Sequence, residues 1–354
     1  MQESFRKYIV ENGGVGMAAH LFAAIDVGSF ELEMGIYETT SRNGLREIDH
    51  LRHVISLGRD TYHTGKISYH LVDEMCQVLE EFAQVMKSYQ VEDYRAYATS
   101  AMREAKNSQI ILEQIRVRTG IQVQVISNSE QRFLGYKAIA MKEAEFQKII
   151  QKGTAIADVS FGSLQISLFD KDSLVSTQNI QQGILRLREN LSGVWSDRQT
   201  VLGIFEDMVD NELYAFKKMY LKDRDIKNLI CIGESILYLA RDEVAGKRVD
   251  RISAADFQKF YEKLIQMPVD QIEDRFGVNQ EYAHLLIPAA IIYKQILEMT
   301  GAEMLWIPGI RMCDGIAADY AEKQKYLKFT HNFDDDILSA SRNMALQHQS
   351  RPED

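Results

Sequence analysis

The sequence predicts an α/β protein made of two similarly built domains, and three observations support this. The chain has 354 residues, enough for two domains at roughly 150 residues each. Short apolar segments typical of strands alternate with longer segments of helical periodicity. An apolar strand that ends in Asp and leads into a Gly-Ser turn occurs twice, at Asp26 and at Asp158, so both halves begin alike.

The first half opens with two short strands, expected at 21–26 and 33–37, on either side of the turn that follows Asp26. Apolar residues at helical spacing predict a helix that is capped by Ser68 and ends at Tyr89. The other elements expected in this half are strands at 94–98 and 123–126 and helices at 108–119 and 129–146.

The second half repeats the opening and then becomes richer in helices. A helix is expected to begin after Gly183. Strands are expected at 154–158, 164–169, 174–179, 228–232 and 304–307, and further helices at 199–220, 235–241, 254–267 and 281–300. We place the boundary between domains near 151–153, giving a leader (1–20), two domains (21–150 and 151–330) and a polar tail (331–354) that forms a short helix or a solvated end.

Composition excludes several classes of protein. With 41 basic and 51 acidic residues the net charge is −10, which argues against a nucleic-acid-binding protein, although a cleft can still be locally positive. The three cysteines are isolated, without a CxxC pair, so we expect free thiols and no cysteine zinc site. The longest apolar run is far shorter than the roughly 20 residues of a membrane span, and no export signal is recognisable. We therefore expect a cytoplasmic protein with no membrane partner.

The repeated turn carries the chemistry. Gly28-Ser29 and Gly162-Ser163 allow backbone N–H groups to approach an anion, because glycine has no side chain in the way. The Asp at the end of each strand, Asp26 or Asp158, is suited to a divalent cation that neutralises phosphate, or to capping the turn. Two phosphate hairpins that face each other across a cleft are typical of actin-like (ribonuclease H-like, ASKHA) domains.

Six segments together resemble the exopolyphosphatase / guanosine pentaphosphate phosphatase family, in its order and at about its spacing. They are 23–29, 64–68, 98–107, 125–130, 158–163 and 183–187, and the resemblance covers roughly residues 21–321. It implies two actin-like domains that flank a phosphate-binding cleft. It also implies removal of a terminal phosphate from polyphosphate, or from the 5′ end of guanosine pentaphosphate, with a divalent metal that we expect to be Mg²⁺. The family often forms dimers, so a homodimer is a further expectation.

The resemblance implies a role for individual residues. Glu130 matches the carboxylate that activates the attacking water, which a carboxylate fixed at a helix start can do, although the helix dipole alone also favours Glu there. Arg103 matches a position facing the phosphates, where a guanidinium can bind two oxygens. The phosphate-binding set is Gly28, Ser29, Arg103, Gly162, Ser163 and Arg186, and the metal-associated carboxylates are Asp158 and Asp26.

The sequence departs from the family pattern in both hairpins and late in the chain. Phe30-Glu31 stands where Asn-Ser is usual, and Ser160-Phe161 replaces two of three glycines. Gln165 replaces a carboxylate, and Glu234 replaces the second glycine of a pair. We expect the ring of Phe161 to point into the core, because the neighbouring Val159 and Ile166 indicate an apolar layer behind this hairpin.

Three classes of function follow from these features. The first is a metal-dependent hydrolase acting on polyphosphate or, alternatively, on guanosine pentaphosphate. The second is a regulator that binds one of these ligands and turns it over poorly, which the altered glycine turn favours. The third, an actin-like sugar kinase or chaperone ATPase, needs an adenosine pocket with a Gly-Gly pair, and Gly233-Glu234 argues against it.

Overall fold

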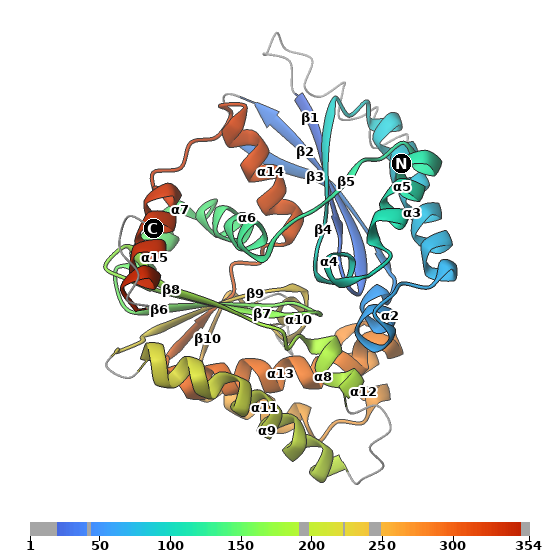
Figure 1. The fold of residues 1–354 in the computed structure, drawn as a ribbon. Coiled ribbons are helices and arrows are strands. Elements are labelled where there is room, and N and C mark those ends of the chain that lie inside the picture. The colour runs from blue at the N-terminus through green and yellow to red at the C-terminus, as the bar shows by residue number, and fades with distance from the viewer. Residues whose placement is uncertain (1–19, 41–43, 191–197, 222–223, 241–248, 348–354) are drawn as a thin grey trace.

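The structure is a computed structural model that describes residues 20–40, 44–190, 198–221, 224–240 and 249–347. Two β-sheets lie one above the other in Figure 1, each with helices packed against it. Nearly all of the predicted leader, 1–20, lies outside the described residues. The predicted domain limits stay a prediction.

The upper sheet has the strand order β3-β2-β1-β4-β5. Its strands are β1 (His20–Val27), β2 (Glu31–Thr40), β3 (Gly44–Val54), β4 (Asp93–Ala98) and β5 (Val123–Val125). The first three are antiparallel neighbours, whereas β4 and β5 run parallel to β1. The sequence did not predict β3, whose apolar residues Leu45, Ile48, Leu51 and Val54 recur every third position and so lack strand alternation.

The lower sheet repeats this design with the order β10-β11-β9-β6-β7-β8. Its strands are β6 (Thr154–Val159), β7 (Leu164–Asp170), β8 (Ser173–Ile180), β9 (Asn228–Ile232), β10 (Arg251–Ser253) and β11 (Met304–Trp306). An antiparallel β6–β7–β8 meander is again followed by a parallel strand, because β9 pairs with β6. The two openings predicted to be alike therefore form equivalent parts of the two sheets.

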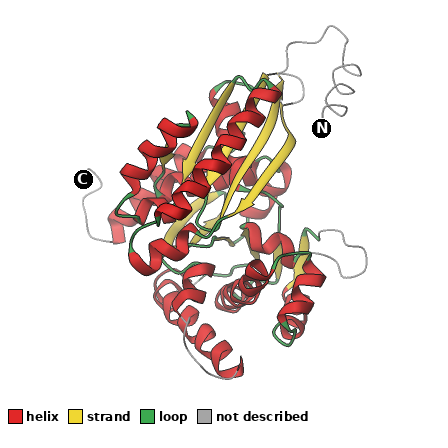
Figure 2. Ribbon diagram, turned by 90° about the vertical axis from the view of Figure 1, so that its right-hand side faces the viewer, coloured by secondary structure: helices red, strands yellow, loops and turns green. Residues whose placement is uncertain are grey.

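Alternate residues of β1 face two different helix layers, as the period of two along a strand requires. Ala23, Ile25 and Val27 pack with α3 (Tyr69–Tyr89) and α5 (Ser108–Thr119). Phe22 and Ala24 pack on the opposite face with α6 (Asn128–Ala140) and α14 (Met312–Lys323). Figure 2 shows helices on both sides of these strands. The short helices α2 (Leu57–Thr64) and α4 (Ser100–Glu104) lie beside the same sheet, at its edge nearest the lower one.

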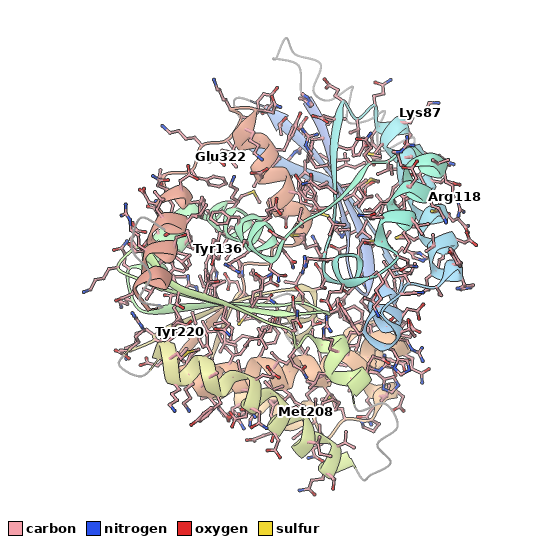
Figure 3. The ribbon with its side chains drawn as sticks, in the orientation of Figure 1. Lys87, Arg118, Tyr136, Met208, Tyr220 and Glu322 are labelled. Carbon is pink, nitrogen blue, oxygen red and sulfur yellow. The ribbon has the colours of Figure 1, made fainter. Side chains whose placement is uncertain are left out.

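The lower sheet is also covered on both faces. One face packs against α8 (Ile184–Asn190), α9 (Arg198–Phe216), α11 (Ala254–Leu264), α12 (Val269–Phe276) and α13 (Gln280–Thr300). The other packs against α6, α7 (Glu143–Ile150) and α15 (Phe333–Gln347). Tyr136 of α6 lies above the strands in Figure 3, and its hydroxyl donates to Ser167 Oγ at 2.5 Å. The π-helical turn Lys217–Leu221 continues α9, and α10 (Glu234–Leu239) follows β9.

Helix α14 comes late in the chain but packs against the first strand and against α6, so it connects the two halves. At Gly315 an added Cβ would lie 2.3 Å from the carbonyl oxygen of Leu134, so the close approach of α14 to α6 needs glycine. The sequence did not predict this helix. This contact holds the middle of α6 against α14.

Two other predicted segments differ in detail. The helix expected over 129–146 is split into α6 and α7 near Met141. The polar tail forms the helix α15, and it is not a solvated end, because Phe333 and Asp336 are buried. Asp336 accepts a hydrogen bond from Leu174 N of β8 at 3.0 Å, and its other oxygen lies 2.6 Å from His331 Nε2. These contacts attach the tail to the lower sheet.

Candidate functional site

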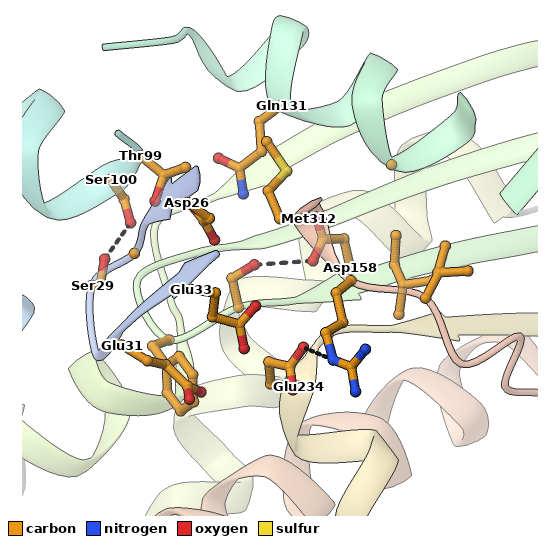
Figure 4. Close-up of a pocket in the computed structure, with 18 residues that line it drawn as sticks. Asp26, Ser29, Glu31, Glu33, Thr99, Ser100, Gln131, Asp158, Glu234 and Met312 are labelled. Atoms are coloured by element: carbon orange, nitrogen blue, oxygen red, sulfur yellow. Dashed lines mark hydrogen bonds and ion pairs between the residues drawn. The ribbon is translucent and has the colours of Figure 1, made fainter. Parts of the chain in front are cut away.

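The two Asp-Gly-Ser hairpins meet at a cavity of about 90 Å³ between the sheets (Figure 4). The β1–β2 hairpin contributes Asp26, Gly28 and Ser29 to its lining, and the β6–β7 hairpin contributes Asp158 and Ser160. The structure thus brings together the Asp residues of both halves. Gly162, Ser163, Arg103, Arg186 and Glu130, which the resemblance also implies, do not line this cavity.

The first hairpin is closed by its own hydrogen bonds. Gly28 N donates to Glu31 O at 2.9 Å, and a Cβ at Gly28 would lie 2.8 Å from that oxygen. Ser29 Oγ lies 2.7 Å from Tyr62 Oη and 2.8 Å from Ser100 Oγ, and it accepts from Ala101 N at 3.2 Å. The hydroxyl predicted to bind phosphate is therefore engaged within the chain.

The second hairpin is packed tightly against the first. Ser160 N donates to Ser163 O at 3.0 Å across the turn. A Cβ at Gly162 would lie 1.9 Å from Tyr62 Oη and 2.2 Å from Ser100 Oγ. Glycine is needed here because side chains of the other half occupy the space where an anion was expected. Ser163 is buried.

Aromatic rings join the two hairpins. The ring of Phe30 lies 4.7 Å from that of Phe161, measured between centroids, and both rings lie within 6 Å of the ring of Tyr282 on α13. Phe30 and Phe161 are 1% and 8% exposed. Phe161 packs in the core, as expected, but it also lines the cavity, so its ring is not turned away from the site. Its aromatic partners come from both halves of the chain. Both rings stand at positions where the sequence departs from the pattern that it otherwise resembles.

Five carboxyl groups line the cavity, which is unusual for a site expected to receive a polyanion. They are Asp26, Glu31, Glu33, Asp158 and Glu234. Burial, followed by the charge of Glu33, raises the pKa of Asp26 and Glu234 well above the ordinary range and that of Glu31 to about 8. Burial raises the pKa of Asp158 to about 6, against the hydrogen bond that it accepts from Ser160 Oγ at 3.0 Å.

Basic side chains offset part of this negative charge. Arg52 Nε lies 2.9 Å from Glu31 Oε2, and Arg311 Nε lies 3.5 Å from Glu234 Oε1. His50 lies 3.7 Å from Glu33 and 3.3 Å from Glu47; burial opposes its protonation, but these carboxylates outweigh burial and raise its pKa to about 9. The guanidinium of Arg52 also hydrogen-bonds Tyr238 and lies over its ring, so it connects β3 to the lower half. Each cation is thus already paired with a carboxylate.

Glu130 is exposed and caps α6. Its carboxylate accepts a hydrogen bond from Ser127 N at 2.7 Å, while Glu130 N donates to Ser127 Oγ at 3.2 Å, which forms a capping box. These hydrogen bonds lower the pKa of Glu130. The adjacent Gln131, in contrast, is buried and lines the cavity, and an amide cannot take a proton from water. The catalytic role of Glu130 stays a prediction.

Replacing Glu130 with alanine is expected to lower the free energy of unfolding by about 0.5–2 kcal/mol, because one half of the capping box is lost. Glu130→Gln keeps an acceptor for Ser127 N and should match the parent protein more closely. Urea unfolding and phosphate release should be measured on both variants. Loss of release in Glu130→Gln with unchanged stability would instead establish the proton-transfer role that the resemblance implies.

The two predicted phosphate-binding arginines lie together at one side of the hairpins, but each has partners inside the chain. Arg103 donates to the carbonyl oxygen of Ile126 at 2.6 Å and to Asn128 Oδ1. Arg186 donates to Gly162 O at 2.8 Å and pairs with the carboxylate of Glu104. An anion that binds these guanidinium groups must replace some of their present hydrogen-bond acceptors.

The predicted metal site stays a prediction, and two observations show how the residues present would suit it. Mg²⁺ favours oxygen ligands, and it commonly binds one or two carboxylates together with phosphate oxygens and water. Asp26 and Asp158 share the cavity, and Asp26 Oδ1 is buried without a hydrogen-bond partner among the described residues. No group of three or more His, Cys, Asp or Glu residues in the described ranges is arranged to hold a metal. The residues therefore fit an ion that arrives with phosphate.

Several residues of the site were not identified from the sequence. Two of them lie in short helices that the sequence did not predict: Tyr62 in α2 and Ser100 in α4. Arg311 directly precedes α14, which was not predicted either, so no periodic pattern marked the three residues. Glu33 gave one usable signal, since a carboxylate inside a strand with apolar neighbours on both sides is unusual.

The cysteines Cys76, Cys231 and Cys313 are buried and unpaired, and they play no part in the cavity lining. Among the described residues, no helix is long and apolar enough to cross a membrane.

Comparison with known proteins bears on the family and the fold. A family model described as the Ppx/GppA phosphatase family matches residues 36–321. The chain is 22% identical to exopolyphosphatase 1 of Mycobacterium tuberculosis (strain ATCC 25618 / H37Rv) over 290 residues, 80% of this chain and 83% of that protein. It is 20% identical to a guanosine-5′-triphosphate,3′-diphosphate pyrophosphatase of Vibrio parahaemolyticus over 307 residues, 86% of this chain and 60% of that protein.

Solved structures support the fold. A Ppx/GppA family member from Aquifex aeolicus superposes with a TM-score of 0.69 at 21% identity, covering 87% of this chain and 99% of that one. An exopolyphosphatase from Cytophaga hutchinsonii superposes with a TM-score of 0.75 at 17% identity, covering 86% and 98%. The predicted α/β architecture of two actin-like (ribonuclease H-like, ASKHA) domains is confirmed.

Proposed function

Because the chain belongs to the Ppx/GppA phosphatase family, we propose that it binds a phosphoanhydride ligand, inorganic polyphosphate or guanosine pentaphosphate, and hydrolyses it slowly or not at all. The observation that carries this proposal is the contact between the hairpins. The tilted rings of Phe30 and Phe161 lie 4.7 Å apart between centroids, at positions where the sequence departs from the family pattern, and a phosphate chain cannot pass between buried rings in contact. A phosphate chain that passes between the hairpins therefore requires them to separate.

The charges in the cavity also support slow turnover. A phosphoanhydride brings several negative charges. Carboxyl groups without an intervening cation offer it no positive charge where they are protonated, as the raised pKa of Asp26, Glu31 and Glu234 favours, and they repel it where they are ionised. Five carboxyl groups line a cavity of about 90 Å³, and the nearest basic side chains are already paired with some of them. The residue at the start of α6 that faces this cavity is Gln131, which has no carboxylate. The neighbouring Glu130 points to solvent, and its carboxylate caps the helix.

Binding is better supported on the side where Arg103 and Arg186 lie. The guanidinium of Arg186 contacts the second hairpin at Gly162 O, and the charge of Arg186 influences the pKa of Arg103, so the two groups lie near each other. Planar guanidinium groups bind phosphate oxygens in pairs. Their present acceptors are carbonyl oxygens, an amide oxygen and the carboxylate of Glu104, for which phosphate oxygens can substitute. A Mg²⁺ ion held by Asp26 and Asp158 would supply charge neutralisation for such a ligand.

Hydrolysis by an opened form is the second candidate, and Asp158 favours it. Asp158 lines the cavity, and a group with a pKa of about 6 is suited to general base catalysis at neutral pH; in this candidate Asp26, without Asp158, would hold the metal ion. In that reaction Asp158 would take the proton of a water whose oxygen bonds to the terminal phosphorus, while the bridging P–O bond breaks. The released terminal phosphate and the shortened chain are the products.

One assay separates the candidates. Dissociation constants and phosphate release should be measured on one preparation with Mg²⁺ and either tripolyphosphate, guanosine pentaphosphate or ATP. We expect binding of one of the first two with kcat at least roughly 100-fold below the common lower value of about 1 s⁻¹. A kcat in the usual range would favour the hydrolase, tightest binding of ATP would favour a kinase or ATPase, and no binding would contradict the proposal.

Arg103 offers the matching binding test. Arg103→Ala should weaken binding of the same ligand, and Arg103→Lys should recover only part of it, because a point charge does not reproduce the paired hydrogen bonds of a guanidinium. Arg116→Ala, which removes a surface arginine paired with Glu113, is the control and should leave affinity unchanged. Equal affinities for Arg, Lys and Ala at position 103 would remove this residue from the binding site.

A further inference from the structure

The side chain of Tyr62 connects three parts of the site. It lies near the end of α2, and its hydroxyl oxygen is 2.7 Å from Ser29 Oγ and 3.1 Å from Ser100 Oγ. On the opposite side the same oxygen touches the turn at Gly162, where even a Cβ would lie only 1.9 Å from it. One hydroxyl therefore lies between the β1–β2 turn, the start of α4 and the β6–β7 turn.

The ring of Tyr62 is covered by the guanidinium of Arg186. The central carbon of that group lies 3.7 Å from the ring centroid, a short cation–π contact. Arg186 Nε donates to Gly162 O at 2.8 Å, so the arginine bridges the tyrosine and the second hairpin. The two side chains thus come from opposite halves of the molecule and close the gap between them.

The groups around the Tyr62 hydroxyl are those that recognise a phosphoryl oxygen. Two serine hydroxyls, the Ala101 N–H that bonds Ser29 Oγ and the Arg186 guanidinium are all donors or able to donate. No carboxylate is among the side chains that contact this hydroxyl within the described residues. The carboxylate of Glu104 is paired with Arg186 beside these donors, whereas five carboxyl groups line the cavity that Ser29 and Ser100 border.

We infer that the hydroxyl of Tyr62 occupies a phosphoryl-oxygen subsite, and that Tyr62 is an internal plug which must leave before a terminal phosphoryl group can bind there. The inference rests on the proposed function, because it concerns the same hairpins. It adds a residue that controls access and a defined position for the ligand. A purely structural role for Tyr62 predicts a different result, namely lower stability without any change in anion affinity.

The test uses the full chain and inorganic tripolyphosphate as the probe, with affinity measured by isothermal titration calorimetry. Tyr62→Ala should bind the probe at least about tenfold more tightly than the parent chain. Tyr62→Phe removes only the hydroxyl and keeps the ring under Arg186, so it should show a smaller gain. Tyr214→Ala, on α9 and 62% exposed, is the control and should bind like the parent chain. In Tyr62→Ala, the further change Arg186→Gln should abolish the gain.

Equal or weaker binding by both Tyr62 variants would overturn the inference. If the alanine variant does not fold, the affinity of Tyr62→Phe alone provides the test. The two proposals can fail separately. Tight binding by the parent chain with no gain on removing Tyr62 overturns only the plug. A gain in Tyr62→Ala with no measurable binding by the parent chain supports the plug and contradicts the proposal that the natural protein binds polyphosphate.

Discussion

Replacing Phe161 with alanine is expected to lower the free energy of unfolding by about 3–5 kcal/mol, the usual cost of truncating a buried phenylalanine. The ring is 8% exposed and contacts Phe30 at 4.7 Å and Tyr282 at 5.8 Å between centroids. Because these partners come from both halves of the chain, the variant loses packing within the lower half and packing between the halves. Urea unfolding followed by circular dichroism measures the change.

A double-mutant cycle with Phe30→Ala tests whether the two rings act on each other. The stability changes caused by mutating two residues in contact are usually not additive. An aromatic pair adds about 0.5–1.5 kcal/mol of stability beyond the effect of the area that it buries. We expect a coupling energy in that range. Tyr214→Ala removes an exposed ring of α9 and should change stability by no more than about 0.5 kcal/mol. Strict additivity of the two Phe variants would show that the contact between the hairpins is not formed in solution.

The free energy of unfolding is expected to fall as pH rises from about 5 to about 9, because buried carboxyl groups must lose their protons. The folded-state pKa is raised to about 6 for Asp158 and about 8 for Glu31, and it is raised well above the ordinary range for Asp26. A raised folded-state pKa gives stability that is complete below the unfolded pKa, near 4, and lost as pH passes the folded value. Glu31 alone contributes on the order of 3 kcal/mol to this loss.

Other groups shape the same pH profile. His50, with a pKa of about 9, also loses its stabilising charge on the alkaline side. Glu47 has a pKa lowered by its hydrogen bond with His50, so its contribution is lost as pH falls through that value. Stability should therefore be highest in mildly acidic solution.

The variant that checks this assignment is Glu31→Gln, which cannot lose a proton. Between about pH 6 and 9 its free energy of unfolding should fall less steeply than that of the parent chain. The variant also lacks the ion pair between Glu31 and Arg52, so the two proteins are compared by the slope of stability against pH and not by its absolute value. Glu81→Gln, which removes an exposed carboxylate of α3, should keep the parent slope. Parallel profiles for the parent chain and Glu31→Gln would show that Glu31 is not buried as the structure has it.

Much of the fold could be predicted because local patterns carry it. The strands β1, β6 and β9 are short apolar segments, and α3, α5 and α13 have the spacing or stop signals typical of helices. Gly120 ends α5 in the left-handed conformation, directly after the helix expected over 108–119. The edge strand β3 was missed because it is only partly buried, and α14 because its contacts are made with residues almost 300 positions earlier.

The sequence by itself determined the pair of Asp-Gly-Ser hairpins, the family to which the chain is similar, and the positions at which it departs from that family. Only the tertiary structure decided what those departures do. It placed Phe30 against Phe161, Tyr62 between the hairpins, Gln131 toward the cavity and Glu130 toward solvent. The physical reason is that turn and strand signals are local, whereas the occupant of a cleft depends on side chains that meet only after distant segments have packed. No spacing within one segment encodes that meeting.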